Sequence, residues 1–403
     1  MPLPADMPPD TPDLSPAGGQ RARTVTVLGI VMILSWGSSF YLAGVFFGPM
    51  AEQTGWPMPW ISAGFSLGLL ISGLCSPKVG TLIQRHGGRR VLAAGMLALA
   101  AGLTLMALAP NIWVYLLAWA VTGLGMAAGL YDAAFSALGR LYGSGARSAI
   151  TLLTLFGGFA STVCWPVSAL LVEALGWRGA LLVYAATHLI VTLPLCLLGI
   201  PRAETPFDIA KPDAGARPPG LYTDPRFWII GLSGALLATI ATILTTTLIP
   251  ILVSQGATMA VAVGIGTLMG PAQVGARLLE MAGRGRHHPV WTMAACTALV
   301  AAGIWALGAG MNFAMAIVAF GMGNGLWSIA RGALPLAIFG PGDYPRIMGR
   351  LAPMSQIASA SGPWIAGALM AGYGAGGTLL ALSVLALLPP LMALALAMTL
   401  RRG

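Results

Sequence analysis

The stretch Gly80–Arg90 reads G-T-L-I-Q-R-H-G-G-R-R and lies between two long apolar segments. Its glycines permit a tight turn and the close approach of two helices. Its arginines mark the side of a membrane on which the turn lies, because short loops rich in Lys and Arg stay in the cytoplasm. The stretch therefore predicts a cytoplasmic hairpin between two membrane-spanning helices.

The composition of the whole chain also indicates a membrane protein. Of 403 residues, 57% are apolar and 8% are charged, whereas a soluble protein carries about 25% charged residues. The net charge of +9 does not indicate nucleic-acid binding, since the basic residues are dispersed among short loops between apolar runs. We therefore expect a lipid bilayer around most of the chain. The four cysteines lie in apolar runs without metal-ligand spacing, and we interpret them as small buried hydrophobes.

A spanning helix needs about 20 apolar residues, and this length predicts an all-α polytopic membrane protein with twelve transmembrane helices. The first six expected helices are 24–49, 60–79, 90–109, 112–138, 149–172 and 179–200. The second six are 227–253, 258–281, 289–309, 312–338, 350–371 and 377–399. The Pro-rich residues 201–226 cannot form a spanning helix, and they predict a cytoplasmic linker between six-helix bundles at 24–200 and 227–403.

The distribution of basic residues orients this topology. All but Arg178 and Arg331 of the 21 Lys and Arg residues lie in the tails, in loops after even-numbered helices, or at the helix ends beside them. Both termini are therefore expected in the cytoplasm. Residues 1–23 are rich in Pro and Asp and lack a basic leader, which predicts a disordered cytoplasmic tail rather than a signal peptide.

An internal repeat divides the expected helices into two sets of six. The matching segments are 129–131 (G-L-Y) with 325–327 (G-L-W), Pro166 with Pro363, and 79–80 (V-G) with 274–275 (V-G). Matches in the same order at nearly constant spacing are typical of a duplicated six-helix unit.

The hairpin also resembles the loop between helices 2 and 3 of the major facilitator superfamily, whose motif is G-x-L-x-D-R-x-G-x-R. The positions that fit are Gly80, Leu82, Arg85, Gly87 and Arg89 or Arg90. Gln84 stands where the family usually has Asp, so the family's acid–arginine latch is altered here. After residue 24 the chain resembles this superfamily over essentially its whole length. The segment 275–277 (G-A-R) further resembles the G-x-R of bacterial oxalate/formate and monocarboxylate carriers.

This resemblance implies two six-helix pseudo-repeats that rock about a central site, with helices 1, 4, 7 and 10 lining the cavity. It implies a monomeric secondary transporter of the bacterial inner membrane, without a cofactor, that moves a small organic anion such as a monocarboxylate with proton or anion coupling. An efflux pump for drugs or other xenobiotics is the alternative. An enzyme is not expected, because the chain has no cluster of His, Asp or Glu at catalytic or metal-binding spacing.

Asp132 is a charged residue within an expected spanning helix, 112–138. A charge at the bilayer centre costs about 2.5–3.5 kcal/mol on insertion scales, so that its presence needs an explanation. One interpretation is a fixed latch between Asp132 and Arg85 or a neighbouring arginine of the hairpin. The other is a carboxylate that couples proton binding to transport or contacts the substrate.

Arg331 lies at nearly the same depth in the expected helix 312–338. Because an arginine keeps its proton, it needs an acid, backbone carbonyls or an anionic substrate. By the resemblance, helices 4 and 10 face one cavity, so Asp132 and Arg331 would pair across it and separate when an anion binds. The alternative is a structural role, in which Arg331 caps carbonyls or packs beside the loop.

Arg277 follows Gln273 by one helical turn and precedes Glu280 by three residues. The second spacing allows an ion pair on the surface of one helix. By the resemblance, Arg277 instead holds a substrate carboxylate, to which a planar guanidinium offers two parallel donors. Both interpretations remain open on the sequence alone.

Aromatic side chains complete the candidate substrate site. Trp36 and Tyr41 lie in the first expected helix, and Trp327 lies in the tenth. In cavity-lining helices such side chains frame a small solute, whereas elsewhere they anchor helices at the membrane interface or pack. The candidate substrate-binding residues are Arg277, Arg331, Tyr41, Trp36, Trp327 and Gln273.

Overall fold

The computed structural model describes residues 18–202, 220–283 and 287–402, and within these residues there is no β-strand. The first half (18–202) contains α1 (Gly18–Gly37), η1 (Phe40–Leu42), α2 (Ala43–Thr54), α3 (Met58–His86), α4 (Gly88–Ala107), α5 (Ile112–Gly129), α6 (Tyr131–Tyr142), η2 (Gly143–Gly145), α7 (Ala146–Gly158), α8 (Ala160–Thr187), η3 (His188–Thr192) and η4 (Leu195–Gly199). The second half (220–402) contains α9 (Pro225–Ser254), α10 (Met259–Thr267), α11 (Met269–Ala282), α12 (Pro289–Gly308), α13 (Phe313–Phe339), α14 (Tyr344–Leu385) and α15 (Leu388–Arg402).

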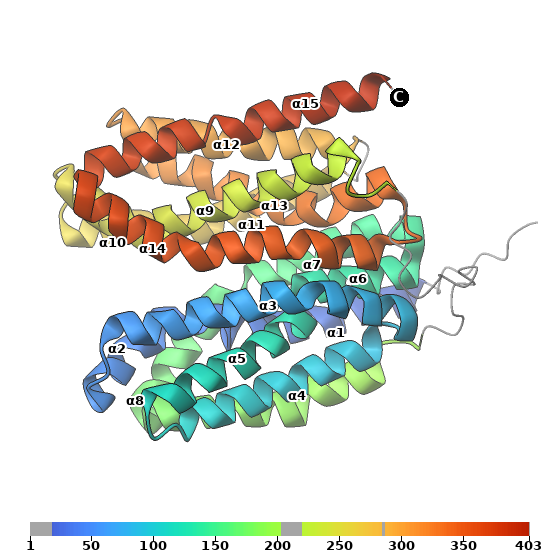
Figure 1. The fold of residues 1–403 in the computed structure, drawn as a ribbon, viewed down its shortest axis with the longest axis horizontal. Helices are drawn as coiled ribbons and strands as arrows, with labels where there is room; N and C mark the ends of the chain where they lie inside the picture. The colour runs from blue at the N-terminus through green and yellow to red at the C-terminus, as the bar shows by residue number, and fades with distance from the viewer. Residues whose placement is uncertain (1–17, 203–219, 284–286, 403) are drawn as a thin grey trace, which may run out of the picture.

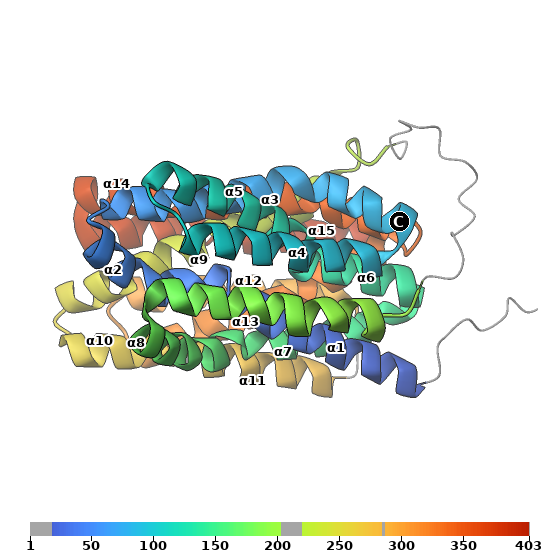
Figure 2. The same ribbon diagram turned by 90° about the horizontal axis from the view of Figure 1, so that it is seen from below.

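The two halves form two helical bundles that lie side by side, with most helix axes along the long dimension of the molecule (Figure 1). The turn between α3 and α4, the start of α1 and the end of α15 lie at one end, on the right in Figures 1 and 2. We call this the hairpin end. It corresponds to the side that the sequence predicts to be cytoplasmic.

The lengths of the helices fit repeated crossings of a membrane. Among the described residues, eight helical stretches are long and apolar enough to cross a bilayer, and two of them run for 88 and 57 residues. A single crossing needs about 20 residues, so each of these two stretches contains more than one crossing. The expected helix 258–281 is not among the eight, because a break at Leu268 divides it into α10 and α11. The pattern is consistent with twelve crossings.

Glycines with positive φ interrupt the long helical stretches at matching places in the two halves. Gly176 (φ 68°) and Gly374 (φ 64°) break α8 and α14, and they are 198 residues apart. Gly143 (φ 53°) and Gly340 (φ 74°) end α6 and α13, and they are 197 residues apart. A residue with a Cβ is strained in this region of backbone space, which glycine enters freely. These pairs extend the internal repeat that the sequence predicts.

The hairpin itself is shorter than the sequence predicts. α3 continues to His86 and α4 begins at Gly88, so the turn consists of Gly87 alone, whose φ is 80°. The prediction of a loop from Gly80 to Arg90 was therefore wrong in extent. Leu82, Gln84 and Arg85 are good helix formers, and no Gly or Pro stands between Gly80 and Gly87 to end the helix earlier.

The predicted tail and linker are only partly described. Residues 18–23 begin α1 and so are not disordered as predicted, and Arg21 donates hydrogen bonds to Gly145 O and Ser148 Oγ. Residues 1–17 and 203–219 lie outside the described residues. Asp224 ends the linker, because its Oδ1 accepts the N–H of Arg226 (2.8 Å) and so caps α9.

Arg178, an exception to the predicted charge distribution, has a structural explanation at the end opposite the hairpin. Its Nη1 donates to Ala107 O (2.5 Å), the last carbonyl of α4, and to Ala109 O (3.1 Å) just beyond the helix. A cation is favourable there, because the last carbonyls of a helix lack partners and carry partial negative charge.

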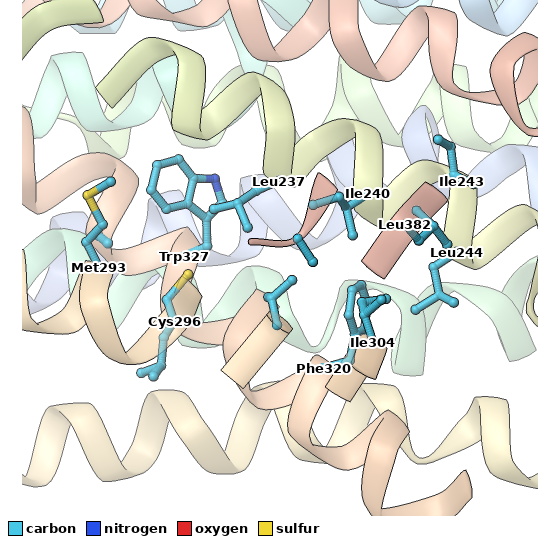
Figure 3. Close-up of a cluster of buried hydrophobic side chains, with 14 of the residues drawn as sticks. Leu237, Ile240, Ile243, Leu244, Met293, Cys296, Ile304, Phe320, Trp327 and Leu382 are labelled. Atoms are coloured by element: carbon cyan, nitrogen blue, oxygen red, sulfur yellow. The ribbon is translucent and has the colours of Figure 1, made fainter. Parts of the chain in front are cut away.

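Each half has its own apolar core. One cluster of buried side chains comes entirely from the second half, and Figure 3 shows part of it, including Trp327, Phe320 and Ile304. The first half has two clusters, and one of them also includes Leu336, Tyr344, Met348 and Ala360 of the second half. Burial of these side chains joins the halves near the hairpin end.

Candidate functional site

The ion pair between Asp132 and Arg331 joins the two halves. Arg331 Nη2 of α13 donates to Asp132 Oδ2 of α6, and their side chains are 22% and 10% exposed. Asp132 lies in the first turn of α6, because the chain is extended at Leu130 (φ −101°, ψ −169°) and the helix restarts there. The start of a helix favours a negative charge. The predicted pairing of Asp132 with Arg331 is thus present in the structure.

The second carboxylate oxygen of Asp132 is unpaired within the described part of the chain. Oδ1 is buried without a hydrogen bond to any residue that the structure describes. Asp132 and Arg331 line a cavity of about 20 Å³ together with Trp327, Ser355 and apolar residues of α9 and α14. A cavity of this size holds about one water molecule.

Arg277 has the clearest features of a binding group. It is 5% exposed. Its Nε donates to Ser328 Oγ (3.0 Å) and Gly325 O (3.3 Å). Its Nη2 donates to Gln273 Oε1 (3.3 Å). Its Nη1 is buried and has no hydrogen-bond partner among the described residues. Gln273 and Arg277, both predicted for the site, are therefore in contact.

The ion pair between Arg277 and Glu280, one of the two interpretations left open by the sequence, does not form in this structure. Glu280 Oε1 instead accepts hydrogen bonds from Thr292 Oγ1 (2.8 Å) and interacts with His287 Nε2 (3.1 Å). Its Oε1 also lies 4.0 Å from Arg147 Nη2 of the first half. Burial lowers the pKa of Arg147, and the charge of Glu280 opposes this effect. Glu280 therefore joins the halves at the hairpin end, while Arg277 turns toward α13.

Two consecutive glycines of α7 bring Arg277 close to Tyr131 of the first half. A Cβ at Gly158 would lie 1.9 Å from Arg277 Nη1, and a Cβ at Gly157 would lie 1.9 Å from the hydroxyl of Tyr131. Only glycine permits both approaches without displacement. Arg277, Arg331 and Tyr41 all lie near Tyr131. The charged and aromatic parts of the site therefore meet at Tyr131.

Aromatic side chains surround Tyr131 on the side of α1. The centroid of Trp36 is 5.1 Å from that of Tyr131 and 6.1 Å from that of Tyr41. Tyr41 is 5.8 Å from Trp165, whose Nε1 donates to Tyr41 O (3.1 Å). Trp36 Nε1 is buried without a partner among the described residues. We call Trp36, Phe40, Tyr41, Tyr131 and Trp165 the aromatic cluster.

Trp327 lies apart from this cluster. It is 9% exposed and belongs to the apolar core of the second half (Figure 3). A Cβ at Gly234 of α9 would lie 3.1 Å from its ring. Its contact with the site is through the small cavity beside Asp132 and Arg331.

The hairpin motif holds the halves together through close backbone contact. A Cβ at Gly80 of α3 would lie 2.3 Å from Pro345 O, and one at Gly349 of α14 would lie 2.5 Å from Ser76 O. Gln84 Nε2 donates to Gly342 O (2.6 Å), which precedes α14. Gln84 thus links the hairpin to the second half with a neutral hydrogen bond.

The predicted latch between Asp132 and Arg85 is absent from this conformation. Arg85 is exposed and forms no ion pair with any residue that the structure describes. The contact between the hairpin and α6 instead comes from Arg140, whose Nη1 donates to Gln84 O (2.5 Å). The remaining motif positions Leu82, Arg89 and Arg90 form no hydrogen bond or ion pair with the described residues of the second half, and Leu82 is 45% exposed.

Sequence reasoning missed several residues of this region. Tyr344 is fully buried, donates to Gly332 O (2.8 Å), and fills the space above Gly139, where a Cβ would lie 2.1 Å from its ring. Ser328 holds Arg277, three residues before Arg331. Ser328 lies three residues before Arg331 and so on the same face of the expected helix, which could have indicated Ser328 as a residue of the site. No feature of the neighbouring sequence indicates the role of Tyr344.

Comparisons with known proteins decide the family. A sequence model of the Major Facilitator Superfamily matches residues 27–287, more than half of the chain. The chain belongs to this superfamily.

The superfamily members that it resembles include carriers of different kinds. Over 378 residues the chain is 28% identical to monocarboxylate transporter 11 of Homo sapiens, covering 86% of this chain and 75% of that one. Over 119 residues it is 33% identical to multidrug resistance protein MdtG of Salmonella typhi, covering 28% of this chain and 29% of that one. The crystal structure of the human organic anion transporter MFSD10 (TETRAN) superposes with a TM-score of 0.74 at 15% identity, covering 93% and 99% of the two chains, which shows a shared fold.

As a member of the Major Facilitator Superfamily, the chain is a multi-pass membrane transporter for a small molecule and not an enzyme. The predicted fold class is confirmed, because the described residues form an all-helical superfamily fold. The resemblance that the hairpin motif indicated is confirmed as well.

Proposed function

We propose that this superfamily member is a secondary transporter that carries a small organic anion with one carboxylate. The observation that carries the proposal is Arg277, a buried guanidinium whose hydrogen-bond partners are all neutral and whose Nη1 has none among the described residues. A carboxylate is an acceptor with negative charge, so it supplies both the missing partner and the missing countercharge.

The names of the similar proteins support this substrate class. The monocarboxylate transporter and the organic anion transporter carry anions by their names. The predicted bodies 24–200 and 227–403 would rock about Arg277 and the aromatic cluster, joined by the linker 201–226.

We propose that Asp132 and Arg331 form the gate beneath this site. Their ion pair, the close approach of Gly80 to Pro345 and the bond from Gln84 to Gly342 together close the hairpin end. Anion binding at Arg277 or protonation of Asp132 would weaken the pair and let this end open. The transporter would then expose the site alternately on the two sides of the membrane, with protons or a counter-anion as the driving species.

We further propose a location in the bacterial inner membrane, as a monomer with both termini in the cytoplasm. The basic residues gathered at the hairpin end support this orientation. The bacterial relative MdtG supports the cellular location.

Efflux of drugs or other xenobiotics is the second candidate function, because the match to MdtG favours it. That match covers 28% of the chain. A cationic drug would be repelled by Arg277, for which no described acid provides a countercharge. The anion carrier is therefore the better-supported function.

Transport into proteoliposomes tests the proposal. Purified protein is reconstituted, preloaded with unlabelled carboxylate, and exposed to the same carboxylate in radiolabelled form outside. We expect counterflow of at least one monocarboxylate. Arg277→Gln should abolish it, since loss of a charged hydrogen bond costs about 1.5–3 kcal/mol, or roughly 10- to 150-fold in affinity.

Arg23→Gln is the matched control, because Arg23 is exposed and its loss removes the same charge far from the site. It should transport as the parent does. If no monocarboxylate moves, or if Arg277→Gln transports normally, the anion carrier is excluded. Export of a cationic dye by the parent protein would then support the second candidate.

A further inference from the structure

We propose that the transported monocarboxylate bears an aromatic or bulky apolar group, which binds against the aromatic cluster while its carboxylate binds Arg277. This inference rests on the proposed function and narrows its substrate class. It rests on three independent features of the site: its net charge, the unpaired donor of Arg277 and its aromatic surface.

The charges around Tyr131 leave room for one negative charge. Arg277 and Arg331 both lie near Tyr131, but Arg331 is already neutralised by Asp132. Arg277 has only Gln273, Ser328 and a backbone carbonyl as partners. A monoanion therefore neutralises the site, whereas a dicarboxylate would bring a second charge without a countercharge.

The unpaired donor of Arg277 beside Tyr131 fits a single carboxylate group. Arg277 Nη1 lies against Gly158, next to Gly157, which contacts the hydroxyl of Tyr131. A buried donor without an acceptor is costly, and Arg277 Nη1 would gain from an acceptor-only ligand.

The remaining surface of the site is apolar and aromatic. Trp36 is in contact with Phe40 (5.1 Å between centroids) and Tyr131, and Tyr41 with Trp165. The chain leaves regular α-helix between Gly37 and Ala43, and this break places Phe40 and Tyr41 beside Trp36. Trp165 is 47% exposed although its N–H is hydrogen-bonded. Ring faces and edges of this kind bind an aromatic or branched group, and each good ring pair contributes about 0.5–1.5 kcal/mol beyond burial.

Titration calorimetry of the full chain in lipid nanodiscs tests the inference with four probes. They are benzoate, acetate, phthalate as a dicarboxylate, and benzyl alcohol as a neutral aromatic. We expect benzoate to bind at least tenfold more tightly than each of the other three. Empty nanodiscs give the heat of partition into lipid.

Variants of Trp36 separate recognition of the ring from folding. Trp36→Leu should weaken benzoate binding roughly tenfold and leave the weak binding of acetate unchanged, while Trp36→Phe should retain most of the preference. Trp113→Leu is the matched control, because Trp113 is 68% exposed and contacts Trp60 rather than the aromatic cluster. The ratio of benzoate to acetate affinity is a readout that a merely folding-related effect would not change.

The other outcomes distinguish this inference from the proposed function. If acetate or phthalate binds as tightly as benzoate and Arg277→Gln abolishes binding, the aromatic preference is overturned and the anion carrier stands. If benzyl alcohol binds as tightly as benzoate and Arg277→Gln has no effect, both are overturned. If none of the four probes binds, both are likewise overturned.

Discussion

At the level of single residues, the sequence indicated the side chains of the site more reliably than it indicated the partners of those side chains. The spacing of Gln273 and Arg277 correctly indicated a contact, because residues four apart are neighbours on a helix. The same rule failed for Glu280, since Thr292, His287 and Arg147 approach it from other elements. Spacing along one helix gives no information about residues that reach Glu280 from elsewhere in the chain.

Gly158→Ala tests the closeness of Arg277 to α7. The added methyl group would lie 1.9 Å from Arg277 Nη1, so the flexible guanidinium must move away from its position beside Tyr131. We expect anion affinity to fall roughly tenfold while the protein stays folded, as measured by calorimetry and by the melting temperature. Gly275→Ala, where an added methyl group would have no neighbour within 4 Å, should bind as the parent does. Equal affinities for both variants and the parent would contradict this arrangement of the site.

The pair Asp132–Arg331 is suited to a double-mutant cycle. Asp132→Asn leaves Arg331 largely buried without a countercharge, and removal of one partner of a buried pair costs about 3–5 kcal/mol. Arg331→Gln alone leaves the carboxylate unpaired. The double variant should be less destabilised than the sum of the two single variants, by about 1–3 kcal/mol in the free energy of unfolding. Additive losses would show that the two side chains do not interact in the folded protein.

At the scale of elements, hydropathy predicted the spanning segments well, since their length follows from the thickness of the bilayer. It did not predict the breaks within them. The extended backbone at Leu130 places Asp132 at a helix start, yet an apolar run gives no sign of it. The break at Leu268 has a signal that was available, because Pro271 has no N–H to continue the helical hydrogen bonds.

The crossing of α3 and α14 gives a prediction at this scale. Gly80→Leu would place a side chain 2.3 Å from the backbone of Pro345, and a backbone cannot move aside as a side chain can. We therefore expect the hairpin end to open. The distance between spin labels at Arg85→Cys and Gly342→Cys should increase, as measured by double electron–electron resonance.

Gly48→Leu is the control for this measurement, because an added side chain there meets no atom within 4 Å. Its label distance should match that of the parent. An unchanged distance in Gly80→Leu would mean that this crossing does not hold the hairpin end closed.

At the scale of the whole molecule, the sequence predicted two related halves, and positive-φ glycines at matching positions extend that repeat. How the halves meet was predictable only in part. The pairing of Asp132 with Arg331 followed from the superfamily resemblance, whereas Tyr344 between Gly139 and Gly332 depends on the shapes of three helices. Periodicity within one helix carries no information about such contacts.

We propose above all that Arg277 binds the carboxylate of the transported anion. The most direct test of this proposal is a crystal structure with 4-bromobenzoate, in which anomalous scattering locates the bromine. We expect carboxylate density within hydrogen-bond distance of Arg277 Nη1 and a bromine peak beside Trp36 and Tyr41, and we expect both to be lost in Arg277→Gln. A ligand bound elsewhere, or one that stays in place in Arg277→Gln, would contradict it.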